Sequence, residues 1–309
     1  MSLSAKTKKW LSENCLPSLK GKRVLITGAN SGVGFKAAET MVYLGAALIM
    51  ACRSAQKAAA AREALLREYP GADITFMELD LASFDSIDRF AARFREQRID
   101  VDAFVNNAGA FRHPGQKTAD GLDLVFGTNY VGVYRLSERL LPWLTGLGHD
   151  VWYVNTISFV HRYAKVAETD SAFARPGGSL QTYARSKLCL ARYTWFTAQR
   201  YMETNVHALM CHPGIAVTPL GLNAFGLNGS NPLISALCHL FNSPEKSSLS
   251  LAYILSGKAP AGSLVGPAGG FGGWGWPRLN RVSRKVQSGG PQLVCLTESL
   301  MRSAEEGRG

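Results

Sequence analysis

Short, continuously apolar runs alternate with longer amphipathic segments along most of this chain, and that alternation restricts the folds open to it. The apolar runs predict buried strands at residues 23–27, 47–52, 74–79, 102–106, 150–156 and 205–211. Helical periodicity marks residues 33–44, 54–68, 84–97, 122–145 and 182–202. Strands that are apolar on both faces must be covered on both faces. We therefore expect an α/β fold with a doubly wound parallel sheet.

A chain of 309 residues could form one large α/β domain or two smaller ones. We expect one domain with a single Rossmann-type sheet of about seven strands, because no repeat or linker divides the core. Its parts are an N-terminal segment (1–20), a core with the alternating strands and helices (21–218) and a C-terminal extension (219–309). The extension contains two stretches in which Gly, Asn or Pro interrupt apolar residues, PLGLNAFGLNGSNPLISALCHLF and GPAGGFGGWGWP. Such stretches fit an irregular loop with a packing helix, and they fit equally well a lid over the substrate. NPLISALCHLF also fits a membrane-touching helix or a dimer contact.

The charge of the chain narrows the class of partner. Its 34 Lys and Arg residues exceed its 23 Asp and Glu residues, for a net charge of +11. The basic residues are scattered, with the densest cluster at Lys6, Lys8 and Lys9, and no nucleic-acid motif accompanies them. A solvated basic surface, an anionic small molecule or contact with an anionic membrane surface explains the excess, so we expect no nucleic-acid partner.

The cysteines and the N-terminus bear on the cellular compartment. The six cysteines show no metal-ligand spacing and several lie in apolar runs, which predicts buried free thiols and no metal site. The N-terminus lacks an apolar signal-peptide core, and no run of eighteen apolar residues occurs. These features predict a soluble, cytoplasmic protein.

The stretch VLITGANSGVGF joins the first expected strand to the first expected helix. Glycines there let the chain turn sharply and let backbone amides approach a pyrophosphate at the positive helix N-terminus. We predict that a dinucleotide binds at this turn, although a merely tight strand-to-helix turn is the alternative. The residues expected to hold it are Gly28, Asn30, Ser31, Gly32, Val33 and Gly34.

The end of the second expected strand distinguishes between dinucleotides. A free ribose 2′-hydroxyl is usually held there by a carboxylate, about 20 residues after the glycines. This chain has ACRS instead, with Arg53 and no acid. A guanidinium suits a 2′-phosphate, so we expect NADP(H) rather than NAD. The alternative is that Arg53 is a plain surface residue.

Two more strand ends extend the same site. Asp80, followed by Leu81, is expected to accept a hydrogen bond from an adenine amino group. Its alternative role is to cap the next helix, a task that Ser83 could perform instead. The small residues of NNAG suit close passage of the backbone past a cofactor, and the contacts expected there are Asn107, Ala108 and Gly109.

In QTYARSKLCL, Tyr183 and Lys187 lie four positions apart in an expected helix, so their side chains share one face. Exposed Tyr and Lys are common on helices and need no special role. Taken alone, the pair is therefore interpreted as two surface residues without a specific function. Only the surrounding motifs favour a catalytic role.

The motifs TGANSGVG, LDL, NNAG, TNYVG, NTIS, YARSK and HPG, in this order over residues 27–214, resemble the short-chain dehydrogenase/reductase superfamily. TGANSGVG, MACRSAQKA and LDLASFDSI resemble its branch of retinol dehydrogenases, WW-domain oxidoreductases and protochlorophyllide reductases. The resemblance implies a catalytic tetrad of Asn129, Ser158, Tyr183 and Lys187. It also implies that the nicotinamide carboxamide and the pyrophosphate lie beside Pro213, Gly214, Ile215 and Thr218.

The implied roles agree with the chemistry of the side chains. A free tyrosine has a pKa of about 10, and Lys187 with the positive nicotinamide ring would favour the phenolate. Tyr183 would exchange a proton with the substrate oxygen, and Ser158 would hydrogen-bond the same oxygen. Lys187 would also hold the ribose hydroxyls, and Asn129 would anchor a water relay.

One position departs from the branch. NTISFVH has Ile157 where the branch usually has the first of two adjacent serines. Ser158 occupies the second position and receives the role, with Thr156 as the alternative hydroxyl. We expect His212 to be structural, because Tyr183 already fills the role of proton carrier.

Together these patterns predict an NADP(H)-dependent oxidoreductase that interconverts a carbonyl and an alcohol on a lipophilic substrate such as a retinoid, steroid or polyketide. The apolar region after Thr218 and the branch resemblance favour the lipophilic class, and a cellular NADPH pool would favour reduction. The alternatives are an NADPH-dependent reductase of a carbon-carbon double bond and an NADP-binding scaffold without turnover. The filled tetrad argues against the scaffold. A homo-oligomer and peripheral membrane contact are further expectations that the sequence leaves open.

Overall fold

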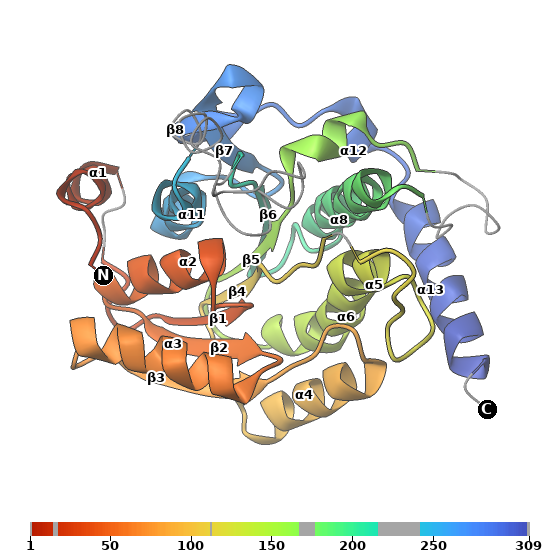
Figure 1. The fold of residues 1–309 in the computed structure, drawn as a ribbon, viewed down its shortest axis with the longest axis horizontal. Coiled ribbons are helices and arrows are strands. Elements are labelled where there is room, and N and C mark those ends of the chain that lie inside the picture. The colour runs from red at the N-terminus through yellow and green to blue at the C-terminus, as the bar shows by residue number, and fades with distance from the viewer. Residues whose placement is uncertain (1, 15–17, 112, 167–176, 216–241, 308–309) are drawn as a thin grey trace.

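The computed structural model describes residues 2–14, 18–111, 113–166, 177–215 and 242–307. Its centre is an eight-stranded sheet in the order β3-β2-β1-β4-β5-β6-β7-β8 (Figure 1). Neighbouring strands are parallel except β8, which runs antiparallel to β7. The strands are β1 (Arg23–Thr27), β2 (Ala47–Cys52), β3 (Ile74–Glu78), β4 (Ala103–Asn106), β5 (Val151–Thr156), β6 (Val206–Cys211), β7 (Leu264–Gly269) and β8 (Trp274–Asn280).

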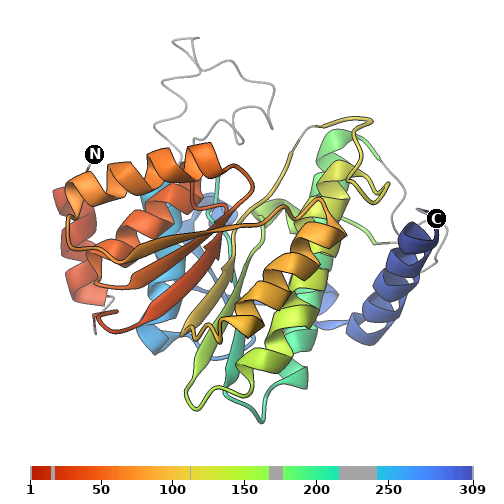
Figure 2. The ribbon, with the colours of Figure 1, turned by 90° about the horizontal axis from the view of Figure 1, so that it is seen from below.

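Helices cover both faces of this sheet (Figure 2). On one face lie α2 (Gly32–Tyr43), α3 (Ala55–Glu68) and α11 (Pro244–Tyr253), which share a buried apolar cluster with β1 and β2. On the other lie α4 (Phe84–Glu96), α6 (Gly132–Leu144) and α8 (Ser179–Arg200), in a second, larger cluster. The remaining elements are α1 (Ala5–Asn14), α5 (Leu124–Phe126), η1 (Gly127–Val131), η2 (Phe159–Tyr163), η3 (Ile254–Lys258), η4 (Gly270–Gly272), α12 (Arg284–Gln287) and α13 (Gly290–Glu306).

The chain builds the sheet outward from β1 in two directions. β2 and β3 extend it on one side, and β4 begins the other side directly beside β1. In doubly wound sheets, ligands bind in the crevice at the carboxyl ends of the strands where the order reverses. The topology therefore puts the expected site at the ends of β1 and β4.

The doubly wound α/β class predicted from the sequence is confirmed. All the strands and helical segments expected from the apolar pattern are present, with ends that differ by at most three residues. Ser83 caps α4 and accepts a hydrogen bond from the backbone of Ser86, so Asp80 is free of that task.

The hairpin of β7 and β8 was not expected. Loop with a packing helix, or a lid, were the alternatives for GPAGGFGGWGWP, yet this stretch forms the end of β7, η4 and much of β8. Its glycines and prolines are typical of turns, so the sequence pattern did not indicate strands. Pro267 faces Pro277 across the hairpin, and the register shifts between Pro267 and Gly269. Prolines and bulges are tolerated at sheet edges; β8 is an edge strand, and the pairing of β7 with β6 ends before Pro267. With this hairpin the sheet has eight strands, where about seven were expected.

The C-terminal helix α13 is an integral part of the domain. The hydroxyls of Tyr130 and Thr297, both fully buried, lie 2.6 Å apart. Arg135 of α6 pairs with Glu305 of α13 and with Asp88 of α4. A pair of hydrogen-bonded hydroxyls and a shared guanidinium thus fix α13 against the α4, α6 and α8 layer.

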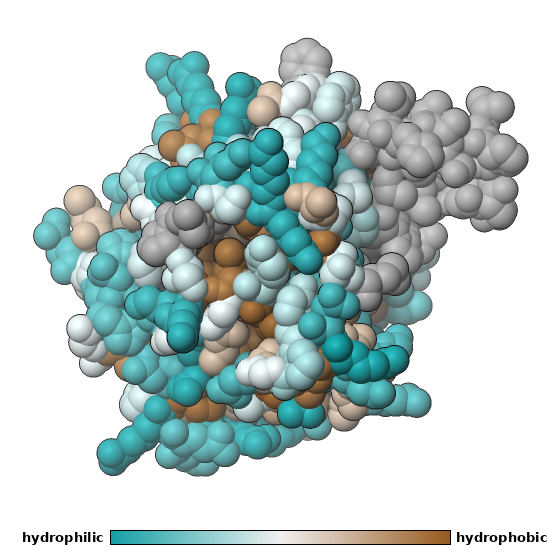
Figure 3. Space-filling view, turned by 90° about the vertical axis from the view of Figure 1, so that its left-hand side faces the viewer, coloured by the Kyte–Doolittle hydropathy of each residue, from teal (hydrophilic) through white to brown (hydrophobic). Residues whose placement is uncertain are grey.

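The surface and the thiols complete the description. The face on the side of α1 and α3 is mostly hydrophilic, with apolar groups in small patches (Figure 3). No helix among the described residues has the length and apolar character needed to cross a membrane.

Cys52, Cys189 and Cys211 are buried free thiols as predicted, whereas Cys295 is exposed on the outer face of α13. Cys15 and Cys238 lie outside the described residues.

Candidate active site

A cavity of about 920 Å³ opens at the carboxyl ends of β1 to β5. It brings together most of the residues predicted for the site: Gly28, Asn30, Ser31, Gly32, Val33, Gly34, Arg53, Asp80, Leu81, Asn107, Ala108, Gly109, Tyr183, Lys187 and Pro213. Asn129, Ser158, Gly214 and Ile215 are not part of its wall and lie behind or beside it. Thr218 lies outside the described residues.

The glycine turn after β1 is tight because of its own backbone. Gly28 and Gly32 have φ values of +69° and +57°, in the left-handed region that favours glycine. A Cβ on Gly28 would lie 2.8 Å from the Cα of Ala108, and one on Gly34 would lie 2.2 Å from the carbonyl oxygen of Gly28. The turn therefore delivers the amino end of α2 to the cavity, where its backbone N–H groups favour an anion.

Thr27, a residue that the sequence reasoning missed, ties this turn to β4. Its buried hydroxyl accepts hydrogen bonds from the backbone N–H groups of Asn107 and Ala108, both at 3.0 Å. The Asn107 amide in turn donates to the Thr27 carbonyl at 3.1 Å. The available signal was the threonine that precedes Gly28 at the end of a buried strand.

The cavity rim at α3 carries two cations. Ser54 caps α3 by accepting a hydrogen bond from the backbone of Lys57 at 3.3 Å. The exposed side chains of Arg53 and Lys57 line the cavity on either side of this cap. Lys57 was also missed, although its place in the first turn after ACRS puts it beside Arg53.

Asp80 lines the next part of the wall, at the end of β3. Its carboxylate accepts a hydrogen bond from the backbone of Ala82 at 2.9 Å, and its own N–H donates to Ser86. The side chain is thereby held at the cavity with acceptor capacity to spare.

Asn129 lies in η1, a single turn of π-helix between α5 and α6. Its side-chain oxygen accepts from the backbone N–H of Ala110 at 2.6 Å, and its amide donates to the Ala110 carbonyl at 2.9 Å. The amide also donates to Ser186 of α8 at 3.3 Å. A Cβ on Gly109 would lie 3.2 Å from the Asn129 oxygen and 3.6 Å from Lys187 Nζ, so a larger residue there would press on Asn129. The π-turn, a feature frequent at functional sites, was not visible in the sequence.

Tyr183 and Lys187 share one face of α8, as their spacing predicted. Lys187 is 4% exposed, and its Nζ donates to the Thr156 carbonyl at 2.9 Å and lies 5.9 Å from the centre of the Tyr183 ring. Burial lowers the pKa of the Lys187 ammonium to about 8. Burial raises the pKa of the Tyr183 phenol, and a hydrogen bond with Ser158 acts in the opposite direction.

The geometry distinguishes the two candidate hydroxyls after β5. Thr156 lines the cavity, but its hydroxyl lies 3.5 Å from the sulfur of Cys211, on the β6 side. Ser158 is not part of the cavity wall, and its side chain is the one that hydrogen-bonds with the Tyr183 phenol.

The segment after β6 borders the cavity and is held by a buried amide. Gly214 has a φ of +75°, and a Cβ there would lie 2.4 Å from the carbonyl oxygen of Gly273. The backbone of Asn242 donates to Ile215 at 3.2 Å, and its side-chain oxygen accepts from Gly275 at 3.0 Å. His212 is fully buried, and burial lowers its pKa to about 3, which suits the structural role expected of it.

Beside Tyr183 the cavity wall becomes apolar. The ring of Phe111 meets the Tyr183 ring edge to face, with centroids 4.9 Å apart. Ile157 and Leu124 line the same region, and His113 and Gln116 add polar groups to the wall. Phe111, Leu124, His113 and Gln116 belong to no motif recognised in the sequence, because they come together only in the fold.

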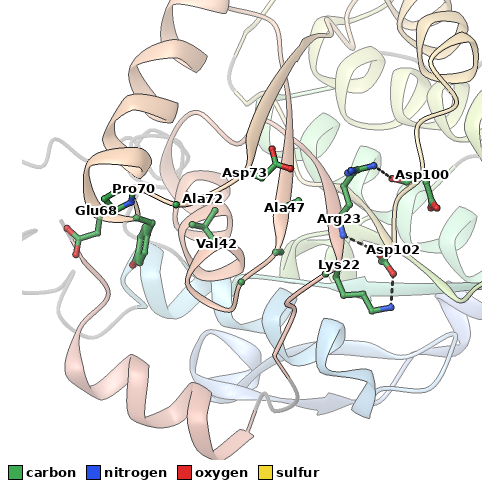
Figure 4. A pocket seen from close by; sticks show the side chains of 15 residues that line it. Lys22, Arg23, Val42, Ala47, Glu68, Pro70, Ala72, Asp73, Asp100 and Asp102 are labelled. Atoms are coloured by element: carbon green, nitrogen blue, oxygen red, sulfur yellow. Dashed lines mark hydrogen bonds and ion pairs between the residues drawn. The ribbon is translucent and has the colours of Figure 1, made fainter.

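A second cavity, of about 810 Å³, lies at the amino ends of β1 to β4 and contains none of the predicted residues (Figure 4). Two of its charged groups, Lys22 and Asp102, pair with each other. Lys22 Nζ lies 2.7 Å from the Asp102 carboxylate, which also accepts from the backbone of Arg23 at 2.8 Å. We therefore assign the function to the first cavity.

Comparisons with known proteins agree with this location. Residues 22–225 match the family described as short chain dehydrogenase. Retinol dehydrogenase 13 of Homo sapiens is 32% identical over 242 residues, which make up 77% of this chain and 72% of the relative. Retinol dehydrogenase 14 of Homo sapiens is 35% identical over 216 residues, 66% of this chain and 64% of the relative. These relatives confirm the likeness to the retinol dehydrogenase branch.

A solved structure extends the likeness to nearly the whole chain. The crystal structure of an uncharacterized protein from Mycobacterium Paratuberculosis superposes with a TM-score of 0.74 at 29% identity, over 93% of this chain and 96% of the other. The family match covers the glycine turn, the carboxyl ends of β1 to β5 at the cavity and all four residues of the expected tetrad. This chain belongs to the short chain dehydrogenase family of oxidoreductases.

Proposed function

We propose that the protein is an NADP(H)-dependent oxidoreductase that interconverts a carbonyl and an alcohol on a lipophilic substrate. One observation carries the proposal: a single cavity has a glycine turn and two cations at one end and Tyr183 with Lys187 at the other. The first end suits a phosphorylated dinucleotide, and the second suits proton transfer.

The residues present fit such a cofactor. The amino end of α2 and its glycines suit a pyrophosphate, and Arg53 with Lys57 suits a 2′-phosphate. Thr128 offers a buried hydroxyl at the cavity wall that has no hydrogen-bond partner among the described residues. When bound, the nicotinamide would supply or accept the hydride. Lys187 would hold its ribose, and Pro213, Gly214, Ile215 and Thr218 are the proposed neighbours of its amide and phosphates.

The side chains around Tyr183 divide the remaining chemistry. Tyr183 donates a proton to the carbonyl oxygen during reduction and accepts one from the alcohol in the reverse direction. Ser158 donates a hydrogen bond to the same oxygen and fixes its position. Asn129 orders the backbone of Ala110 beside Lys187, and Lys187 favours the phenolate when protonated.

The apolar wall beside Tyr183 supports a lipophilic substrate. Phe111, Ile157 and Leu124 present hydrocarbon where the substrate carbon skeleton would lie, and burial of such a skeleton is favourable at about 25 cal/mol per Å². The relatives named retinol dehydrogenases support the same class.

The test is NADPH and NADH oxidation by the purified protein with a panel of lipophilic ketones and aldehydes. We expect turnover with NADPH, and roughly 10²–10⁴-fold slower turnover in Tyr183→Phe with unchanged NADPH binding. The matched control is Tyr163→Phe, because Tyr163 is 76% exposed. Binding of NADPH without turnover would favour a scaffold, reduction confined to carbon-carbon double bonds would favour the alternative enzyme, and failure to bind either dinucleotide would refute the proposal.

A further inference from the structure

The turn after β5 carries a buried histidine that the proposed chemistry does not use. His161 is 2% exposed and lies in η2, three residues after Ser158. Its Nδ1 lies 2.5 Å from the carbonyl oxygen of Ser158, and its backbone N–H donates to the same oxygen at 3.1 Å. A carbonyl oxygen can only accept, so Nδ1 carries the hydrogen in this contact.

We propose that His161 is a positioning residue, which holds Ser158 by its carbonyl group so that the Ser158 hydroxyl stays in contact with the Tyr183 phenol. The inference rests on the proposed function and assigns His161 no contact with substrate or cofactor.

Ser158 needs such a restraint because of its place in the chain. The preceding residue, Ile157, is still bound to the sheet through its backbone N–H and the Cys211 carbonyl at 2.8 Å. Ser158 itself is extended, with φ −136° and ψ 149°, and η2 begins immediately after it. A small rotation at this junction would swing the hydroxyl away from Tyr183, and a second hydrogen bond to the same peptide group resists that rotation.

The far end of the turn is held independently. Lys285 of α12 donates to the carbonyl oxygens of Arg162 and Ala164 at 2.8 and 3.0 Å. His161 thus has a fixed backbone from which to hold Ser158. The charged or titratable groups that face His161 are Arg162, Lys285 and His212.

The environment disfavours the charged form of His161. Burial lowers its pKa, the hydrogen bond with the Ser158 carbonyl acts in the opposite direction, and the positive charges of Arg162 and Lys285 lower it further. The neutral ring with its hydrogen on Nδ1 and the protonated ring can both donate to that carbonyl. The contact therefore needs no change in the protonation of His161, and this separates positioning from proton transfer.

The consequence of losing His161 appears at Tyr183. The hydrogen bond with Ser158 lowers the pKa of the Tyr183 phenol, against the effect of burial. Among the described residues, Lys187 on the same helix and the uncharged Phe111 also lie against that ring. Displacing Ser158 without touching Tyr183 should therefore raise the pKa that governs turnover, as removal of the Ser158 hydroxyl should also do.

The experiment compares His161→Asn, whose side-chain amide nitrogen takes the place of Nδ1, with His161→Leu, which has no donor. We expect His161→Leu to lower kcat roughly tenfold or more, to shift the pH profile upward as Ser158→Ala does, and to leave the KM for NADPH unchanged. His161→Asn should restore both kcat and the profile. The double variant Ser158→Ala/His161→Leu should be no slower than Ser158→Ala, since both changes remove the same contact.

A matched control and a direct readout complete the design. Val160→Ala disturbs the packing of the same turn without removing the hydrogen bond, so it should not move the profile. The ionisation of Tyr183 is followed by NMR of protein labelled at tyrosine Cζ, with the resonance assigned by its loss in Tyr183→Phe. It should titrate higher in His161→Leu than in the wild type and His161→Asn, and His161→Ala replaces His161→Leu should the latter not fold.

The two proposals fail in different ways. Equal titration of Tyr183 in the Asn and Leu variants, or additive losses in the double variant, would overturn the positioning role. A wild-type protein that reduces no carbonyl, but whose Tyr183 resonance responds as expected, would overturn the proposed function and leave the positioning role standing.

Discussion

Lys187 carries a charge that its surroundings disfavour. Its amine is buried against the Thr156 carbonyl beneath Tyr183. Burial is the main cause of its low pKa, and the neighbouring Cys211 acts weakly in the opposite direction. A buried amine of this kind is unusual for structure alone, because desolvation of an ammonium is costly. The residue is thus better explained by the chemistry at Tyr183 than by stability.

This burial predicts how stability depends on pH. The folded pKa of Lys187 is about 8 and its ordinary value is 10.5. Between these values the unfolded chain binds the proton and the folded chain does not, so stability rises with pH across that window. The contribution of this group amounts to roughly 3 kcal/mol. Urea unfolding between pH 7.5 and 10 should show the rise in the wild type relative to Lys187→Met.

The comparison with Lys187→Met removes the contributions of tyrosines and thiols that titrate in the same range. Lys117→Met, at an exposed lysine, serves as control and should follow the wild type. A difference between wild type and Lys187→Met that stays flat with pH would contradict the assignment.

Helix α13 illustrates how a terminal element joins the core. It is anchored to η1 by the contact between Thr297 and Tyr130 and to α6 by the ion pair of Glu305 with Arg135. The hydroxyl contact is fully buried and the ion pair is partly exposed. Exposed ion pairs contribute little, whereas a buried polar group that loses its partner is costly.

Thr297→Val tests this anchor at constant shape. Loss of the Thr297 hydroxyl should lower the free energy of unfolding by about 1–3 kcal/mol. Ser303→Ala, on the exposed side of the same helix, should leave it unchanged. The measurement is chemical denaturation of both variants, and equal stability of the two would show that the contact does not anchor α13.

The elements that could be predicted from sequence are those with local signals. The apolar face of α8 and the glycines before α2 are written in consecutive residues, so the fold class and most of the cavity wall followed from them. Strands β7 and β8 gave no such signal, because Pro267, Pro277 and the glycines between them are residues that usually mark turns. The contacts of Phe111 with Tyr183 and of His161 with Ser158 depend on loop geometry that no spacing rule encodes.

At the scale of the whole molecule, the cavity is lined by residues from both halves of the sheet, on either side of the switch point between β1 and β4. A dinucleotide that spans it would touch α2 and α3 on one side of the switch point and α8 on the other. A ligand that binds only the folded state stabilises it by about 2.7 kcal/mol at a hundred times its Kd. The cofactor should therefore be detectable in the thermal stability of the entire domain, without any substrate.

The preference for NADPH or NADH can be measured by the change in thermal stability that each dinucleotide causes. NADPH should raise the thermal midpoint more than NADH at equal concentration, because Arg53 and Lys57 would pair with the additional phosphate. Arg53→Ala should reduce the NADPH shift towards that of NADH. Arg67→Ala, at an exposed arginine near the other end of α3, is the matched control. Equal shifts with both dinucleotides in the wild type would argue for a cofactor without the 2′-phosphate.

The hydrogen bond between the backbones of Asn242 and Ile215 has a consequence for how this protein can vary. It brings two positions that are distant in sequence to one point beside β7 and β8, and residues 216–241 leave and rejoin the described chain there. Closing a longer loop costs only slowly more entropy once its ends are pinned. A change in the number of residues between positions 215 and 242 should therefore leave the sheet, Tyr183 and Lys187 in their places.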